Sequence, residues 1–298
     1  MNKWIKAFRL RTLPLAISSI LMGGFVAYQL GFVAWDILVF ALITTLFLQI
    51  LSNLANDYGD FSKGTDNDNR VGPMRAMQSG MISKQSMKRA IWIVVLLSFS
   101  SGIYLVYLSF GLKNLFLSLL FILIGLLAIL AAIRYTIGKR AYGYSGYGDL
   151  YVFLFFGWVA VIGSYYLISL SFDWIILLPA SSMGLFSSAI LNLNNLRDHQ
   201  NDEASGKMTL VVKLGFQKAR YYHFALIASG WISFMLFLFL KDSPALVYMI
   251  VLSLPFFIRN VLFVFKVKEE YKLDPELKKL ALSITLFTIL YGFGLFLS

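Results

Sequence analysis

The chain alternates between long apolar runs without charges and short polar connections. The hydrocarbon core of a bilayer is about 30 Å thick and requires roughly 20 apolar residues in a helix. Nine segments meet this requirement, near residues 13–34, 37–56, 90–109, 115–133, 149–170, 174–195, 221–240, 245–264 and 280–298. We therefore predict an all-α, polytopic membrane protein. Because no linker rich in Pro, Gly or Ser interrupts the pattern, we expect residues 1–298 to form a single transmembrane domain.

Composition and charge support a membrane protein and indicate its orientation. The chain of 298 residues is 59% hydrophobic, yet it carries a formal net charge of +11. If the N-terminus is cytoplasmic, 24 of the 26 Lys and Arg residues fall on the cytoplasmic side or at that membrane edge, and only Lys113 and Lys241 lie outside, as the positive-inside rule requires. We expect this orientation, and we expect no nucleic-acid partner. Cysteine is absent, which excludes disulfides and thiolate metal sites.

Acidic residues are concentrated in two polar segments that this topology places on the same cytoplasmic side. The first segment follows the second span and the other follows the sixth. Together they hold seven of the 15 acidic residues, namely Asp57, Asp60, Asp66, Asp68, Asp198, Asp202 and Glu203. In the second segment Asn194, Asp198 and Asp202 are spaced four residues apart, which places them on one face of a helix.

The first segment repeats part of this pattern. Asn56 and Asp60 have the same spacing, Gly64 stands where the next acid would fall, and we expect Asp66 to project from a turn. The sequence NLAN at 53–56 is echoed by NLNN at 192–195. This echo favours a duplicated four-helix unit, with the two copies facing each other across a central cavity.

Clusters of carboxylate and amide oxygens, without Cys, suit a hard cation such as Mg²⁺ better than zinc. Mg²⁺ commonly binds one or two carboxylates and completes its coordination with water and substrate phosphates. The pattern therefore predicts a phosphorylated substrate. The alternative is that these acids are solvated or form ion pairs with bases such as Arg70 and Arg197.

Several longer motifs resemble those of the UbiA superfamily of intramembrane prenyltransferases, and in particular its naphthoate branch. The resemblance covers nearly the whole chain, although Leu10 stands where the family often has proline and Gly64 replaces a regularly spaced acid. The matching segments are RTLPLA at 11–16, NDYGDFSKGTD at 56–66, RVGPMRAMQSG at 70–80, YTIGKRAYGYSGYGD at 135–149 and NNLRDHQNDEASGKMTLVVKLG at 194–215.

The resemblance implies both an enzymatic activity and the membrane in which the enzyme lies. It implies Mg²⁺-dependent transfer of a polyprenyl group from an allylic diphosphate to the aromatic acid 1,4-dihydroxy-2-naphthoate, with loss of diphosphate and CO₂. The bacterial cytoplasmic (inner) membrane would hold the enzyme, with the active site opening to the cytoplasm and the apolar interior holding the polyprenyl tail.

The resemblance also implies roles for single residues. The expected metal ligands are Asn56, Asp57, Asp60, Asp66, Asn194, Asp198 and Asp202. Asp60, Asp198, Lys139 and Tyr135 would be catalytic, with the Tyr135 ring stabilising an allylic cation. Arg11, Arg70, Arg75, Arg197 and Lys207 would bind substrates, with Arg11 facing the aromatic carboxylate. Each of these bases has an alternative interpretation as a topology-determining charge. His199 and His223 are expected at the membrane interface.

Two other functions remain open from the sequence. A transporter could also combine internal repeats with many spans, but its charges usually lie within the spans, whereas these spans are almost free of ionisable residues. Within the enzyme class, the alternative is a prenyltransferase acting on 4-hydroxybenzoate or another aromatic acceptor.

Overall fold

The computed structural model describes residues 3–66, 71–139 and 141–298, and within them the regular secondary structure is helical, with turns and loops between the helices and no strand. The α-helices are α1 (Lys3–Phe8), α2 (Leu13–Gln29), α3 (Trp35–Lys63), α4 (Lys84–Phe110), α5 (Leu115–Arg134), α6 (Gly148–Val152), α7 (Gly163–Ser169), α8 (Leu177–Ala204), α9 (Leu210–Leu214), α10 (Phe216–Leu240), α11 (Leu254–Lys266) and α12 (Asp274–Phe296). Short 3-10 segments lie at Leu10–Thr12, Tyr142–Tyr144, Trp174–Ile176, Ala245–Ser253 and Glu270–Leu273, and Phe153–Ile162 is π-helical.

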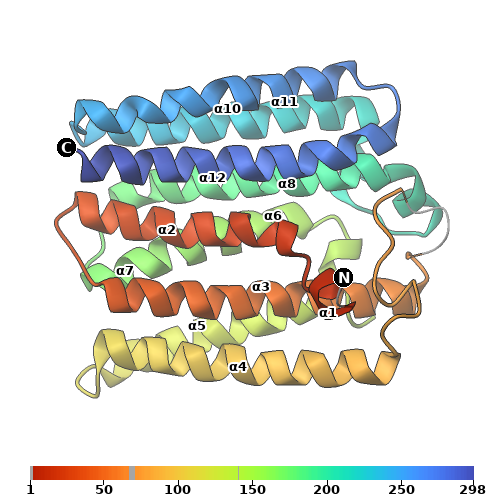
Figure 1. Cartoon of the computed structure of the whole chain (residues 1–298), viewed down its shortest axis with the longest axis horizontal. Helices are drawn as coiled ribbons and strands as arrows, with labels where there is room; N and C mark the ends of the chain where they lie inside the picture. The colour runs from red at the N-terminus through yellow and green to blue at the C-terminus, as the bar shows by residue number, and fades with distance from the viewer. Residues whose placement is uncertain (1–2, 67–70, 140) are drawn as a thin grey trace.

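Within the described residues, nine helical stretches are long and apolar enough to cross a membrane, which confirms the number of spans predicted from the sequence. They run side by side along the long axis of the molecule (Figure 1). The α3 helix packs on α4, α8 packs on α10, and α2 packs on α12. The orientation in the membrane and the internal repeat remain predictions.

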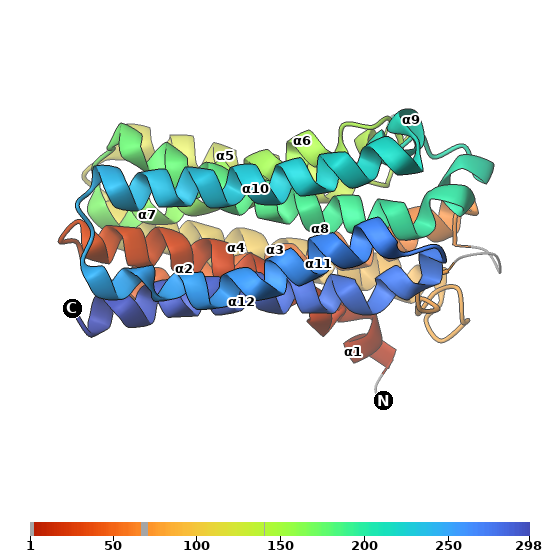
Figure 2. The ribbon, with the colours of Figure 1, turned by 90° about the horizontal axis from the view of Figure 1, so that it is seen from above.

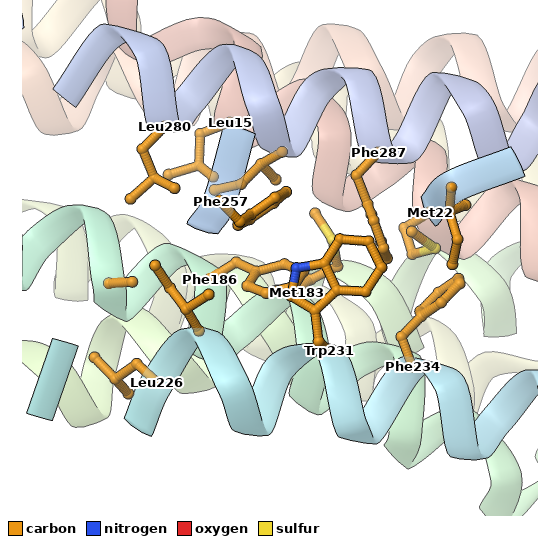
Figure 3. Packing of buried hydrophobic residues seen from close by; sticks show 14 of the residues in the cluster. Leu15, Met22, Met183, Phe186, Leu226, Trp231, Phe234, Phe257, Leu280 and Phe287 are labelled. Atoms are coloured by element: carbon orange, nitrogen blue, oxygen red, sulfur yellow. The ribbon is translucent and has the colours of Figure 1, made fainter. Parts of the chain in front are cut away.

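The packed core is largest among α2, α8, α10, α11 and α12. Figure 3 shows the aromatic side chains Phe186, Trp231, Phe234, Phe257 and Phe287 meeting between these helices. The ring centroids of Phe234 and Phe287 are 4.7 Å apart in an edge-on arrangement, which adds to the stabilisation from burial. The α5 helix differs, because Ile129 is its only buried residue. Only the end of α5 joins a core, where Ile129 packs in a second cluster with residues of α3 and α4, and the rest of the helix forms a thin wall.

The π-helical segment approaches α8 very closely. A Cβ atom on Gly157 would lie 2.8 Å from the Cα of Gly184 and 2.5 Å from the carbonyl oxygen of Ala180. Any larger residue at Gly157 would push the two backbones apart. This close packing fixes the position of the π-helical segment against α8.

Both acidic segments begin on helices, because α3 and α8 continue beyond the predicted span ends near residues 56 and 195. Asp60 lies in the last turn of α3, and Asp198 and Asp202 lie near the end of α8. A helix of 29 residues such as α3 is about 44 Å long, well above the thickness of the hydrocarbon core. Its polar turns can therefore continue beyond the lipid.

Gly64 ends α3 rather than replacing a ligand within it. Its φ of 74° is left-handed, and its N–H donates to the carbonyl of Phe61 (3.2 Å). Glycine is the common residue at this position after a helix because it has no Cβ penalty there. Asp66 consequently follows the helix in a turn, as expected. The ends of α3 and α8 lie at the same end of the bundle, opposite the C-terminus (Figures 1 and 2).

Candidate active site

A cavity of about 1180 Å³ is lined by residues of α2, α3, α4, α5, the π-helical segment, α7, α8 and α12. Its long apolar walls come from α4, α5 and the π-helical segment, and its polar groups are gathered on α3, on α8 and near the N-terminus. The polar and charged side chains that line it include Arg9, Arg11, Thr12, Gln49, Asn53, Asn56, Asp57, Asp60, Arg75, Asn194 and Lys207. The cavity thus combines one charged end with a large apolar volume.

Asp60 is the centre of the first acidic cluster. It is 3% exposed, and Arg75 donates a hydrogen bond to its Oδ2. Arg75 also donates to Asp66 Oδ2 (3.0 Å) and to the carbonyl of Asn56 (3.1 Å). The hydroxyl of Tyr144 donates to Asp60 Oδ1 (2.7 Å). One arginine therefore joins the end of α3 to the turn that follows it.

The charge states of Arg75 and Tyr144 follow from their surroundings. Burial alone lowers the pKa of Arg75, but the negative charges of Asp60 and Asp66 outweigh burial and raise it. Burial and then the charge of Asp60 raise the pKa of Tyr144. Both effects keep the arginine cationic and the tyrosine a neutral donor.

Arg197 organises the second cluster and is fully buried. Its Nε donates to Asp198 Oδ1 (2.9 Å) and its Nη2 donates to Asp198 Oδ2 (2.5 Å). It also donates to Asn194 Oδ1 (3.0 Å) and, from α8 to α12, to Asp274 Oδ1 (2.5 Å). Arg11 contacts the same oxygen of Asp274 at 3.4 Å. Arg197 thus holds protein carboxylates, and it is not among the residues that line the cavity.

Lys207 lies just after α8 and does line the cavity. Its ammonium is 3.2 Å from Asp202 Oδ1, and its backbone N–H donates to the Asp202 carbonyl (2.7 Å). Burial alone lowers the pKa of Lys207, but the charges of Asp202, Asp60 and Asp198 outweigh it, and the pKa is raised. Lys207 therefore brings a positive charge to the cavity, facing both acidic clusters.

Direct contacts join the two acidic segments. Asn201, on α8, donates to the carbonyl of Thr65 (3.1 Å), which follows α3. The hydroxyls of Thr65 and Tyr144 are 2.6 Å apart, and the backbone N–H of Met208 donates to the carbonyl of Tyr144 (3.1 Å). Our predictions from the sequence gave no role to Thr65 or Asn201, although both lie inside the motifs that carry the family resemblance.

The donor set is compatible with a hard divalent cation. Asp57 and Asp202 are 1% exposed, and no described residue forms a hydrogen bond with Asp57 Oδ1 or Asp202 Oδ2. Buried carboxylate oxygens without a partner are costly, and Mg²⁺ is a cation that binds such oxygens. Among the described residues, no three His, Cys, Asp or Glu side chains converge on one point. Four of the carboxylates form ion pairs instead, Asp60 and Asp66 with Arg75, Asp198 with Arg197, and Asp202 through its Oδ1 with Lys207.

Other predicted residues have different positions. Tyr135 lines the cavity, its ring 5.3 Å from that of Tyr142, and burial and then the charge of Asp149 raise its pKa. Lys139 is exposed and does not line the cavity, so the structure does not bring it to the acidic clusters. Arg70 lies outside the described residues.

The two histidines also have different surroundings. His199 is 2.9 Å from Glu270. His223 is fully buried against Asn260 (2.9 Å), inside the helical bundle.

Comparison with known proteins agrees with this architecture. Residues 16–294 match the model of the UbiA prenyltransferase family. The chain is 40% identical over 295 residues to 1,4-dihydroxy-2-naphthoate octaprenyltransferase from Escherichia coli K12, covering 99% of this chain and 95% of the relative. It is also 40% identical to the Haemophilus influenzae protein of that name, over 99% and 96% of the two chains.

Solved structures share the fold. A UbiA homolog from Archaeoglobus fulgidus bound to DMAPP and Mg²⁺ superposes with a TM-score of 0.64 at 18% identity, over 99% of both chains. The apo structure of a UbiA homolog from Aeropyrum pernix K1 has a TM-score of 0.70 at 16% identity, over 97% of this chain and 98% of that one.

Proposed function

Because this chain belongs to the UbiA prenyltransferase family, we propose that it transfers a polyprenyl group from polyprenyl diphosphate to 1,4-dihydroxy-2-naphthoate. The observation that carries this proposal is the similarity, over nearly the full length, to relatives named for that reaction. The cavity suits such substrates, because it has a charged end for a diphosphate and apolar walls for a polyprenyl chain.

In the proposed reaction, the C–O bond between the allylic carbon and the diphosphate breaks. The ring carbon that bears the carboxylate forms the new C–C bond. The electrons of the carboxylate bond return to the ring as CO₂ leaves, which restores aromaticity without a further base. The negative charge gained by the diphosphate must be stabilised as it develops.

Different residues of the chain would bind the diphosphate, hold the metal ion and stabilise the allylic cation. Arg75 and Lys207 line the cavity as cations and would face the diphosphate oxygens. A homolog of the same fold has been solved with Mg²⁺, and here Asp57 and Asp202 offer unpaired oxygens to such an ion, with Asp60, Asp66, Asp198, Asn56 and Asn194 as further candidate ligands. When bound, Mg²⁺ would neutralise charge on the leaving group. The Tyr135 ring would face the allylic carbon, and the apolar walls would exclude water.

The protein would work in the bacterial cytoplasmic membrane. The multi-pass architecture supports a membrane location, and the excess of basic residues at the end that holds the acidic clusters favours a cytoplasmic opening.

The deciding experiment supplies purified protein with octaprenyl diphosphate, Mg²⁺ and two aromatic acids side by side, 1,4-dihydroxy-2-naphthoate and 4-hydroxybenzoate. We expect release of diphosphate and CO₂ and a prenylated naphthalene product identified by mass. Prenylation of 4-hydroxybenzoate alone, without CO₂, would overturn the choice of acceptor. Asp60→Ala and Asp198→Ala should each abolish turnover while the protein still accumulates in the membrane.

A further inference from the structure

A second group of polar residues lines the cavity deeper than the acidic clusters. On α3, Gln49, Asn53, Asn56 and Asp60 follow one another at intervals of three or four residues, so they lie within about 60° of arc on one helix face. All four line the cavity. Gln49 lies two turns, about 10 Å, from Asn56. This part of the face is neutral, whereas the part near Asp60 is charged.

Hydrogen bonds to two backbone carbonyls fix how this group is oriented. Asn53 Nδ2 donates to the carbonyl of Phe8 (2.8 Å) and to Thr12 Oγ1 (2.9 Å). Thr12 Oγ1 donates its only hydrogen to the carbonyl of Arg9 (3.0 Å). Since carbonyl oxygens can only accept, the oxygen of Thr12 must accept from its other neighbours. Gln49 Nε2 lies 3.2 Å from this oxygen and 3.4 Å from Asn53 Oδ1, and it is therefore the donor to both.

The orientation of the Gln49 amide has a chemical consequence. With its nitrogen held by Thr12 and Asn53, Gln49 Oε1 is the atom left for the cavity, and no described residue donates a hydrogen bond to it. A ligand at this position must supply an N–H or O–H donor. A polyprenyl diphosphate has only acceptors, whereas a dihydroxynaphthoate has two phenolic hydroxyls.

We propose that Gln49 Oε1 accepts a hydrogen bond from a ring hydroxyl of the aromatic acceptor, and that Thr12 and Asn53 position the Gln49 amide for this contact. The proposal rests on the proposed function. Arg11, next to Thr12, also lines the cavity; its guanidinium lies 3.4 Å from Asp274 and would bind the acceptor carboxylate. The ring then lies between Gln49 and the charged end, where the allylic carbon is released.

This arrangement makes Gln49 a specificity-determining residue. An aromatic acid without the hydroxyl leaves a desolvated amide oxygen unpaired, and sites that hydrogen-bond a substrate hydroxyl discriminate strongly against analogues that lack it. Gln49→Leu keeps the approximate volume and removes the acceptor atom. It should therefore weaken binding of the aromatic acceptor and leave binding of the prenyl diphosphate unchanged.

The test measures KM for each substrate and the inhibition constants of 1-hydroxy-2-naphthoate, 4-hydroxy-2-naphthoate and 2-naphthoate. We expect the unsubstituted protein to bind at least one hydroxy acid about fivefold or more tightly than 2-naphthoate, and Gln49→Leu to reduce this ratio to near one. Ser98→Ala is the matched control, because Ser98 also lines the cavity but donates within its own helix, to Val94 (2.8 Å). An unchanged ratio in Gln49→Leu, or a rise only in the KM for prenyl diphosphate, would overturn the proposal.

Two variants of Thr12 test whether Thr12 positions the Gln49 amide. They also test the proposal if the Gln49→Leu protein does not accumulate. Thr12→Val removes the oxygen that holds the Gln49 nitrogen, so the ratio of inhibition constants should fall, whereas Thr12→Ser should restore it. Equal ratios in Thr12→Val and Thr12→Ser would refute the positioning role. If the unsubstituted protein prenylates only 4-hydroxybenzoate, the proposed function fails, and the same comparison with 4-hydroxybenzoate and benzoate still tests Gln49.

Discussion

Arg197 and Asp198 are consecutive residues of α8, and their side chains form a two-point contact in which Nε and Nη2 of the arginine lie 2.9 Å and 2.5 Å from the two carboxylate oxygens. Successive residues on a helix do not normally face each other. Here the third guanidinium nitrogen, Nη1, donates a hydrogen bond to Asp274 Oδ1 on α12. This contact fixes the orientation of the guanidinium. Asp198 is thereby held in place by contacts that reach a different helix.

Removal of Arg197 should strongly destabilise the protein. Arg197→Leu leaves Asp198 without its paired contact and Asp274 without its buried partner, and breaking a buried ion pair from one side costs about 3–5 kcal/mol. We expect a clear fall in the apparent Tm measured in detergent. Lys241→Ala is the control, because both side chains of the Lys241–Asp173 pair are solvent-accessible, 29% and 40% exposed, at a distance of 2.7 Å. Exposed pairs contribute at most about 1 kcal/mol, and equal losses in both variants would contradict the role given to Arg197.

Tyr144→Phe should lower turnover without unfolding the protein. The change removes the hydrogen bond to Asp60 and the contact with Thr65 but keeps the ring, whose centroid lies 3.8 Å from the Lys63 ammonium. A hydrogen bond to a charged group contributes about 1.5–3 kcal/mol, so we expect a loss of about tenfold or more in kcat/KM. Tyr147→Phe, at an exposed position, should behave like the unsubstituted enzyme. The idea fails if the two variants are equally active.

One pair of variants shows whether Lys207 or Lys139 binds the diphosphate. Lys207 is 7% exposed and lines the cavity beside Asp202, whereas Lys139 is exposed and away from the cavity. Lys207→Met should raise the KM for polyprenyl diphosphate at least tenfold, because a desolvated cation facing a diphosphate is lost. Lys139→Met should change it by less than twofold. The reverse order would restore Lys139 as the catalytic lysine predicted from its motif.

The number of spans could be predicted from hydropathy alone, since each helix must present roughly 20 apolar residues to lipid. Hydropathy could not show where those helices end, because α3 and α8 continue as polar helices beyond the apolar run. For α8 the four-residue spacing of Asn194, Asp198 and Asp202 did indicate this continuation. The left-handed backbone of Gly64 explains why a regular spacing of acids stops there. A gap in the ligand pattern was in fact the end of a helix.

The candidate site was predictable where its residues lie inside motifs, as for Asp60, Asp198 and Lys207. The partner of Arg197 was not, because Asp274 lies 77 residues further along the chain and no motif marks it. Gln49 was missed for a different reason. It is a single neutral residue in an apolar run, and only the hydrogen bonds to Thr12 and Asn53 show which of its atoms faces the cavity.

Asp57 offers the most direct test of the metal site. Its Oδ1 is buried without a hydrogen bond from any described residue, so a bound Mg²⁺ would stabilise the folded protein by mass action. Chelation should abolish turnover, and added Mg²⁺ should restore it and raise the apparent Tm in the absence of substrates. Asp57→Asn keeps the shape but removes the charge, so it should reduce the Mg²⁺-dependent rise in Tm by at least half. Asp36→Asn, at an exposed acid near the start of α3, should leave that rise intact, and an equal rise in both variants would show that Asp57 does not bind the ion.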